Sequence, residues 1–154
     1  MRVTSSKRSA RGANVIEIGV TAFIMLIVAL LCMNAGIIVL GSCNLERACR
    51  NAARAAAQCD NPASALQAAQ AITASHALNS IWFTGPVVED AQTSYQDFGG
   101  TPPSPDQLPF VKVTTSMIVR VPAPILLFDA NFGHSSLKLS RSCIFPIVRT
   151  QLYL

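Results

Sequence analysis

Few residues in this sequence have the type and spacing that chemistry requires. The two histidines, His76 and His134, stand in no motif that links an imidazole to a nucleophile and an acid. Gly99 and Gly100 lie among prolines and give no phosphate-binding loop, and the five cysteines include no C-x2-C pair of the kind that binds zinc. We therefore expect no enzyme, no metal site and no cofactor.

One carboxylate has an unusual position. Glu17 precedes a stretch that carries no other charged residue until Glu46. A carboxylate among packed apolar helices is unfavourable unless it is paired with a cation. Glu17 therefore either has such a partner or only marks the edge of the apolar stretch.

The element that positions Glu17 is a long apolar helix. Residues 18–40 make a run of 23 in which Asn34 is the only strongly polar residue. About 20 apolar helical residues span the hydrocarbon core of a bilayer, and buried helices of soluble proteins rarely run this long without a charge. The apolar region of a cleaved secretory signal is shorter, about 7–15 residues. The run predicts a transmembrane helix.

Charges flank this helix in a definite order. Three arginines follow it, and the residues before it include four bases and no acid, namely Arg2, Lys7, Arg8 and Arg11. The count of bases favours a cytoplasmic N-terminus only slightly. A basic leader, Gly12, four further residues, Glu17 and a long apolar helix together resemble the N-terminus of type IV pilins.

The resemblance implies a specific maturation step. In type IV pilins a membrane-embedded prepilin peptidase cuts after the glycine, which here separates Gly12 from Ala13. Glycine has no Cβ, so its extended backbone can come close to a protease. The new α-amino group of Ala13 would then pair with Glu17 of a neighbouring subunit.

Small residues in the predicted transmembrane helix lie roughly along one stripe. They are Gly19, Ala22, Ala29 and Gly36. Small residues let helices approach closely in lipid, which suits a pilin-like bundle, but chance placement of these common residues explains the stripe equally well.

The helix is expected to continue beyond the membrane. Residues 43–58 are rich in alanine and arginine, both strong helix formers, and Glu46 and Arg50 are spaced for an i,i+4 ion pair. An apolar stripe and a basic stripe lie on different sides of this segment, formed by Leu45, Ala48, Ala52 and Ala55 and by Arg47, Arg50 and Arg54. Because no aromatic residues interleave with the arginines, the basic stripe indicates a solvent or headgroup face and no nucleic-acid site.

The helical segment after the predicted membrane span points to a particular subgroup of pilin-like proteins. The segment 51–57 (NAARAAA) after a membrane helix is similar to the TadE/TadG-like pseudopilins, minor pilin-like proteins of the tight-adherence (Flp) pilus system. The likeness covers residues 7–58 well and the C-terminal strands loosely, and it departs from the family at Ile18, where an aromatic residue usually follows the glutamate. It implies a basic leader over 1–12, a transmembrane and spine helix over 13–58, and a small extracytoplasmic head over 59–154.

The resemblance also implies a location and a set of partners. The chain would cross the bacterial inner membrane once, with its N-terminus cytoplasmic and its C-terminus periplasmic, and could enter a surface pilus or serve a related type II/IV secretion system. Its partners would be the prepilin peptidase, other pilin or pseudopilin subunits, the inner-membrane assembly platform and the lipid bilayer. The alternative is a membrane-tethered extracytoplasmic binding module, with a lipid anchor at Cys43 because residues 40–43 (LGSC) look like a lipoprotein cleavage box.

Local patterns predict an α+β head with a second helix and an antiparallel sheet. Asn61 and Pro62 form a helix start, His76 lies on a face of that helix, and Asn79 is its expected stop. Residues 97–109 contain six Gly or Pro and predict a loop.

Residues 110–121 predict a strand with one apolar face, formed by Val111, Val113, Thr115, Met117, Val119 and Val121. A return strand over 137–145 has Leu137, Leu139, Cys143 and Phe145 on one face, which Arg141 interrupts, and Pro146 at its end or at a sheet edge.

The cysteines admit more than one pairing. Cys32 lies within the predicted membrane helix and Cys43 at its edge, whereas Cys49, Cys59 and Cys143 would lie in an oxidising compartment if the head is outside the cytoplasm. We expect a disulfide between Cys59 and Cys143, with Cys49–Cys59 as the rival, since spacing does not determine connectivity.

Charge follows the same division of the chain. The 154 residues carry 12 bases and 8 acids, a net charge of +4, and only 13% of them are charged. This is too few for a disordered tail or a highly charged nucleic-acid binder. Cleavage after Gly12 would remove four bases and no acid, leaving eight of each.

Overall fold

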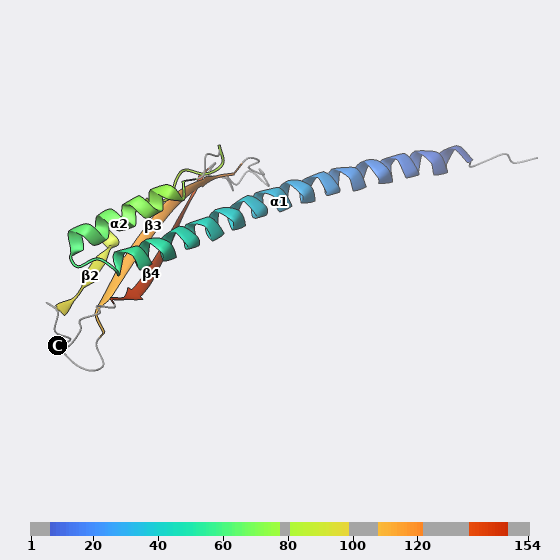
Figure 1. The fold of residues 1–154 in the computed structure, drawn as a ribbon. Coiled ribbons are helices and arrows are strands. Elements are labelled where there is room, and N and C mark those ends of the chain that lie inside the picture. Colours follow the sequence, from blue (N-terminus) through green and yellow to red (C-terminus); the bar gives the residue numbers. More distant parts are fainter. Residues whose placement is uncertain (1–6, 78–80, 99–107, 122–135, 148–154) are drawn as a thin grey trace, which may run out of the picture.

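A single helix dominates the molecule. The structure is a computed structural model that describes residues 7–77, 81–98, 108–121 and 136–147, with residues 7–13 described by their backbone only. Helix α1 runs unbroken over Lys7–Ala56, and its 50 residues extend about 75 Å at 1.5 Å per residue. Figure 1 shows its N-terminal half projecting away from the rest of the fold and its C-terminal half packed within it. The predicted continuous helix is confirmed; it begins at Lys7, before the expected start, and ends two residues before Gln58.

Helix α2, Pro62–Ser75, follows after a short turn and lies beside the C-terminal half of α1 (Figure 1). Asn61 is its N-cap, as predicted, and the Asn61 side-chain oxygen accepts from the backbone N–H of Ser64 at 2.8 Å. The helix ends earlier than predicted, with His76 as its C-cap, and Asn79 lies outside the described residues. Its buried face carries only small residues, Ala65, Ala69 and Thr73, which let the two helices approach closely.

The sheet has four antiparallel strands built around β3, Phe110–Arg120. Strand β4, Ser136–Pro146, pairs with β3 along its whole length, from Phe110 opposite Pro146 to Arg120 opposite Ser136. On the other side of β3 lie two short strands, β1 (Val87–Val88) and β2 (Ser94–Gln96), separated by the 3-10 turn η1 (Asp90–Gln92). Both long strands are therefore confirmed, with Pro146 at the end of an edge strand, while β1 and β2 were not predicted. The expected loop over 97–109 lies mostly outside the described residues.

The core forms where α1 and α2 cover one face of this sheet. Alanines of both helices, Ala52, Ala53, Ala56, Ala65 and Ala69, pack against Val111 and Val113 of β3. A second cluster, nearer the projecting half of α1, contains Leu45, Met117 and Val119, with Ile37, Ile38, Phe83 and Leu139 around it. Val111, Val113, Thr115, Met117 and Val119 are all buried, so the predicted apolar face of β3 is the core face. These contacts give an α+β fold whose head is attached along the C-terminal half of α1.

Candidate functional site

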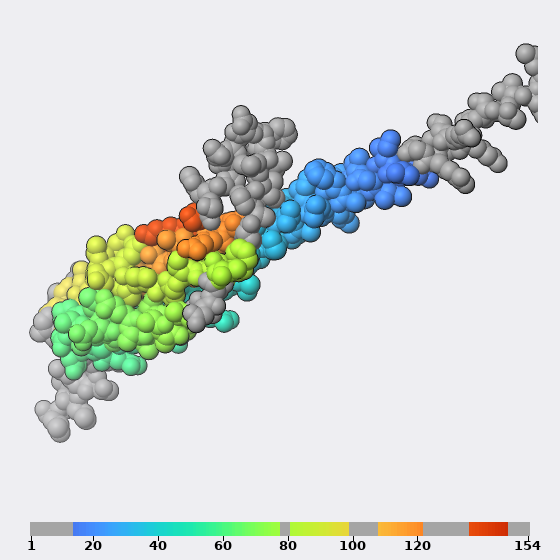
Figure 2. Space-filling model, turned by 90° about the horizontal axis from the view of Figure 1, so that it is seen from above, coloured from blue at the N-terminus to red at the C-terminus, as the bar shows by residue number. Residues whose placement is uncertain are grey.

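The projecting half of α1 is apolar and exposed. Within Asn14–Ala56, the most apolar 18-residue window has a mean hydropathy of 2.8, and none of it is buried against the rest of the molecule. Large apolar side chains are exposed all along this segment, for example Phe23 (62% exposed) and Met25 (65% exposed). Figure 2 shows this blue segment extending beyond the head as a rod. Among the described residues, one helix is therefore long and apolar enough to cross a membrane, and its burial pattern excludes a role as a core helix of the described fold.

The predicted maturation and assembly residues lie along this rod. Gly12 and Ala13 are in the second turn of α1, so a protease that needs an extended substrate would first have to unwind the start of the helix. Glu17 is exposed on the helix surface and forms no ion pair within the described part of the chain. The structure of a single chain places Glu17 one turn beyond Ala13, and it leaves the predicted cleavage and pairing as predictions.

The four predicted packing residues are also exposed. A Cβ added to Gly19 or to Gly36 would meet nothing within 4 Å, and both Ala22 and Ala29 face outward. The small-residue stripe therefore has no partner helix among the described residues and is open to another chain or to lipid.

Gly41 marks the point where the rod enters the head. A Cβ at this position would lie 2.9 Å from Phe83 Cε1 and 3.0 Å from Val119 Cγ2, closer than a real methyl group tolerates. Glycine thus lets the helix backbone lie directly against the second core cluster, which Ile37 and Ile38 also contact about one turn earlier. Sequence reasoning missed this residue, although a glycine inside a long helix is a signal of close packing.

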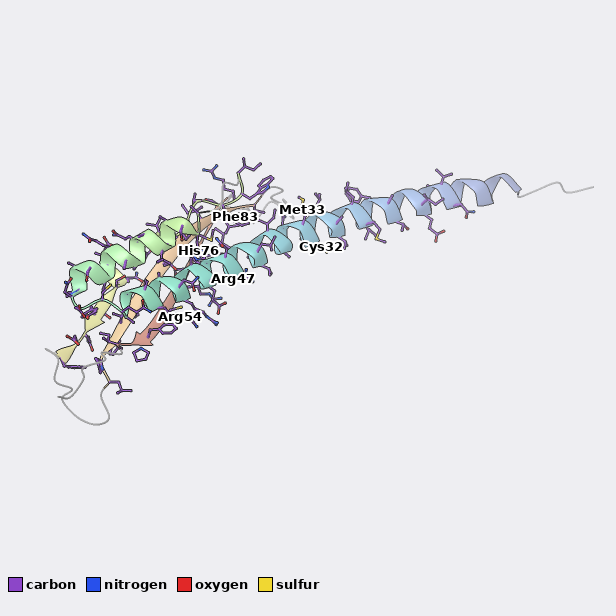
Figure 3. The ribbon with its side chains drawn as sticks, viewed as in Figure 1. Cys32, Met33, Arg47, Arg54, His76 and Phe83 are labelled. Carbon is purple, nitrogen blue, oxygen red and sulfur yellow. The ribbon has the colours of Figure 1, made fainter. Side chains whose placement is uncertain are left out.

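Beyond Gly41 the helix has two distinct faces, as predicted. Of the predicted apolar stripe, Leu45, Ala48 and Ala52 are fully buried and Ala55 is half-buried, whereas the three arginines of the basic stripe are exposed. Arg50 pairs with Glu46 one turn before it, and the Arg54 guanidinium lies over the Phe145 ring, 5.4 Å from its centroid. Figure 3 shows Arg47 and Arg54 on the same side of the helix. The stripe is a solvated face that also holds the end of β4 through a cation–π contact.

His76 fixes the end of α2 to α1. Its carbonyl accepts from Asn44 Nδ2 at 3.2 Å, and its Nε2 lies 3.1 Å from Asn51 Nδ2 (Figure 3). Both asparagines belong to α1, so the histidine has a structural explanation, and His134 lies outside the described residues. Among the described residues no group of three or more His, Cys, Asp or Glu side chains is placed to hold a metal ion.

A second ion pair crosses the sheet. Lys138 Nζ of β4 lies 2.6 Å from Glu89 Oε1, beside Ser116 of the central strand. The hydrogen bond with Lys138, aided by one with Ser116, holds the pKa of the Glu89 carboxyl below its ordinary value. The sequence gives no sign of this pair, because its partners are far apart in the chain and Glu89 lies next to the very short β1.

The cysteines are all free thiols in the structure. Cys59 Sγ donates to Ala55 O within its own turn, at 3.5 Å. Cys143 instead contacts Cys49, and their thiols form a hydrogen bond. The structure therefore places Cys143 beside Cys49, and the predicted Cys59–Cys143 disulfide stays a prediction. Cys49 lies within α1, whereas Cys59 lies ten positions later, beyond the end of the helix at Ala56.

Comparisons with known proteins assign no family, because the chain matches no protein-family model, no curated protein and no solved structure. What the chain can do follows from two features of its own geometry. One is the exposed apolar half of α1, and the other is a small head fixed along the second half of the same helix.

Proposed function

We propose that this chain is a pilin-like subunit of the tight-adherence pseudopilin type, a structural or assembly component held in the bacterial inner membrane by α1. The observation that carries the proposal is the apolar window of α1, none of which is buried by the head that packs on the same helix. Such a helix needs an apolar environment outside the chain, and the two that fit are lipid and the helices of other subunits.

The dimensions of the helix support this environment. The apolar run over 18–40 extends about 35 Å at the helical rise, against about 30 Å for the hydrocarbon core of a bilayer. Ile37, close to the end of that run, packs against the second core cluster of the head. The head would therefore stand at the membrane surface, on the periplasmic side if the basic leader stays in the cytoplasm.

The N-terminal motif supplies the assembly step of the proposal. Cleavage after Gly12 creates an α-amino cation at Ala13, and Glu17 is the single carboxylate on the exposed apolar half of the helix. In a bundle of subunits each amine would pair with a neighbour's Glu17, while the exposed stripe of Gly19, Ala22, Ala29 and Gly36 permits close helix contact.

The lipid-anchor alternative fits the structure less well. Cys43 is exposed but lies in the interior of α1, two residues beyond Gly41. Cleavage just before Cys43 would remove Ile37, Ile38 and Gly41, and with them part of the second core cluster. A lipoprotein cut before Cys43 would therefore lack part of the helix surface on which the head packs.

Intact-mass spectrometry of the membrane-inserted chain tests the proposal. Co-expressed with a prepilin peptidase of a tight-adherence system, the full chain should lose residues 1–12 and begin at Ala13. Gly12→Leu should block this cleavage, because the side chain prevents close approach of the backbone to the protease. Gly19→Leu is the matched control, since a side chain there meets open space, and it should be cleaved normally. A chain that begins at a lipid-modified Cys43, or equal cleavage of the wild type and Gly12→Leu, would overturn the proposal.

A further inference from the structure

Two cysteines from distant parts of the chain, the buried Cys49 and the half-buried Cys143, meet in the head. Cys49 lies on the sheet-facing side of α1 and is fully buried, and its thiol reaches two strands at once: Sγ lies 3.4 Å from Val113 O of β3 and 3.4 Å from Arg141 O of β4. Cys143 stands directly opposite Val113 in the β3–β4 register and points to the same face. The Cys143 thiol is hydrogen-bonded with Cys49, which places the two side chains next to each other.

We propose that Cys49 and Cys143 form a disulfide that joins α1 to β4 when the head is in an oxidising compartment. The inference rests on the proposed function, since that function places the head in the periplasm. The sequence-based pairings do not share this geometry. A disulfide needs Cα atoms within about 7 Å, whereas Cys59 lies ten residues after Cys49, beyond the end of α1, and its thiol is directed at Ala55 O.

The reaction is a two-electron oxidation by thiol–disulfide exchange. The oxidant is a protein that carries a reactive disulfide. One cysteine of this chain, as its thiolate, attacks that disulfide, forms a mixed disulfide and releases one oxidant thiolate. The second thiolate then attacks the mixed disulfide, which forms the Cys49–Cys143 bond and releases the oxidant as a dithiol. The two electrons pass to the oxidant, and the two protons from the cysteines leave with its thiols or with solvent.

The packing of the head determines when this reaction can occur. Burial, together with the hydrogen bond to Cys49, raises the pKa of the Cys143 thiol to about 12, so its thiolate is scarce in the folded head at neutral pH. Cys49 is enclosed by α1, β3 and β4. The bond therefore forms while the head is still folding, and once formed it is protected from soluble reductants by the same packing.

Mass tagging of the full chain tests the pairing. The protein is taken from bacterial membranes, trapped in acid, denatured and treated with a maleimide tag, with and without prior reduction. Wild-type protein should take up three tags before reduction and five after it, because two of its five cysteines are joined. Cys49→Ala and Cys143→Ala should each take up four tags whether or not they are reduced. Cys59→Ala, the matched control, should take up two tags before reduction and four after. Peptide mapping without reduction should find Cys49 joined to Cys143.

Two further measurements separate failure of this proposal from failure of the proposed function. A C-terminal phosphatase fusion reports whether the head is periplasmic. Purified full chain in detergent, unfolded in urea and refolded in a glutathione redox buffer, reports whether the pair forms wherever the head resides. Three results together would refute the membrane topology, and with it the cellular disulfide. These are a disulfide in the refolded protein, free thiols in cells, and a fusion that reports a cytoplasmic head. Free thiols in both samples, or a mapped bond that includes Cys59, would overturn the pairing itself.

Discussion

Replacing Leu45 by alanine should destabilise the head by about 3 kcal/mol. Leu45 is fully buried between α1 and β3, where it contacts the cluster of Met117 and Val119. The substitution removes three carbon atoms, which is about 2.4 kcal/mol at about 0.8 kcal/mol per buried methylene. The cavity that remains adds to this, and measured substitutions of this kind range over about 2–5 kcal/mol.

Urea unfolding of the full chain in detergent micelles measures the effect. Trp82 is the only tryptophan and immediately precedes Phe83, which packs on the same cluster, so its fluorescence follows the unfolding of this part of the head. With an m-value of about 2 kcal/mol per molar urea, a loss of about 3 kcal/mol lowers the midpoint by about 1.5 M.

Leu40→Ala is the matched control for this experiment. It makes the same substitution five residues earlier on the same helix, where the side chain is 65% exposed. Its free energy of unfolding should change by no more than about 0.5 kcal/mol, a midpoint shift of about 0.25 M. If Leu45→Ala had no larger effect than Leu40→Ala, the head would not pack on α1 at this position, and the description of a rod that enters the head would be refuted.

Three other substitutions test separate features. Gly41→Leu should lower the urea midpoint by an amount equivalent to about 1–3 kcal/mol, because its Cβ would collide with Phe83, whereas Gly36→Leu, which points into open space, should not lower it. The Glu89–Lys138 pair stabilises the head above the ordinary glutamate pKa of 4.5, and this contribution is lost as the pH falls through the lower pKa that Glu89 has in the folded head. The urea midpoint of the wild type should therefore fall between about pH 5 and about pH 3 by more than that of Lys138→Met. Glu17→Gln should be cleaved after Gly12 yet reach the sheared pilus fraction at least tenfold less than wild type, since loss of a buried ion pair costs about 3–5 kcal/mol. Glu46→Gln, which removes an exposed pair, is its control, and immunoblots showing equal incorporation would refute the pairing role of Glu17.

Sequence patterns predicted the features of this fold that depend on neighbours along the chain. The absence of charge over 18–40 and the alanines after it predicted one continuous helix, and the residue pair Asn61-Pro62 predicted the start of α2. The alternation over 110–121 predicted the core face of β3, because a strand exposes alternate residues to the same side.

Features that depend on long-range geometry were not predictable in this way. Strands β1 and β2 have two and three residues, too few to establish a period. The contact between Cys49 and Cys143 requires both the β3–β4 register and the rotation of α1 about its axis, and neither can be read from spacing. His76 lies at helical spacing, yet the earlier end of α2 turns it into a cap that binds α1. The roles of Gly12 and Glu17 depend on other molecules, so they stay predictions.

Because α1 is continuous, the head cannot rotate independently of the apolar half of the helix. Each residue of an α-helix adds about 100° of rotation and 1.5 Å of rise. The packing of the apolar half in an assembly therefore sets both the rotation of the head about the helix axis and its position along that axis. Inserting one residue between Gly19 and Ala29, well before the cluster contacts of Ile37 and Ile38, would turn each head by about 100° relative to the start of its own helix without altering the packing of the head. Such an insertion would separate the register of the stems from the arrangement of the heads, and would show which of the two the surrounding machinery recognises.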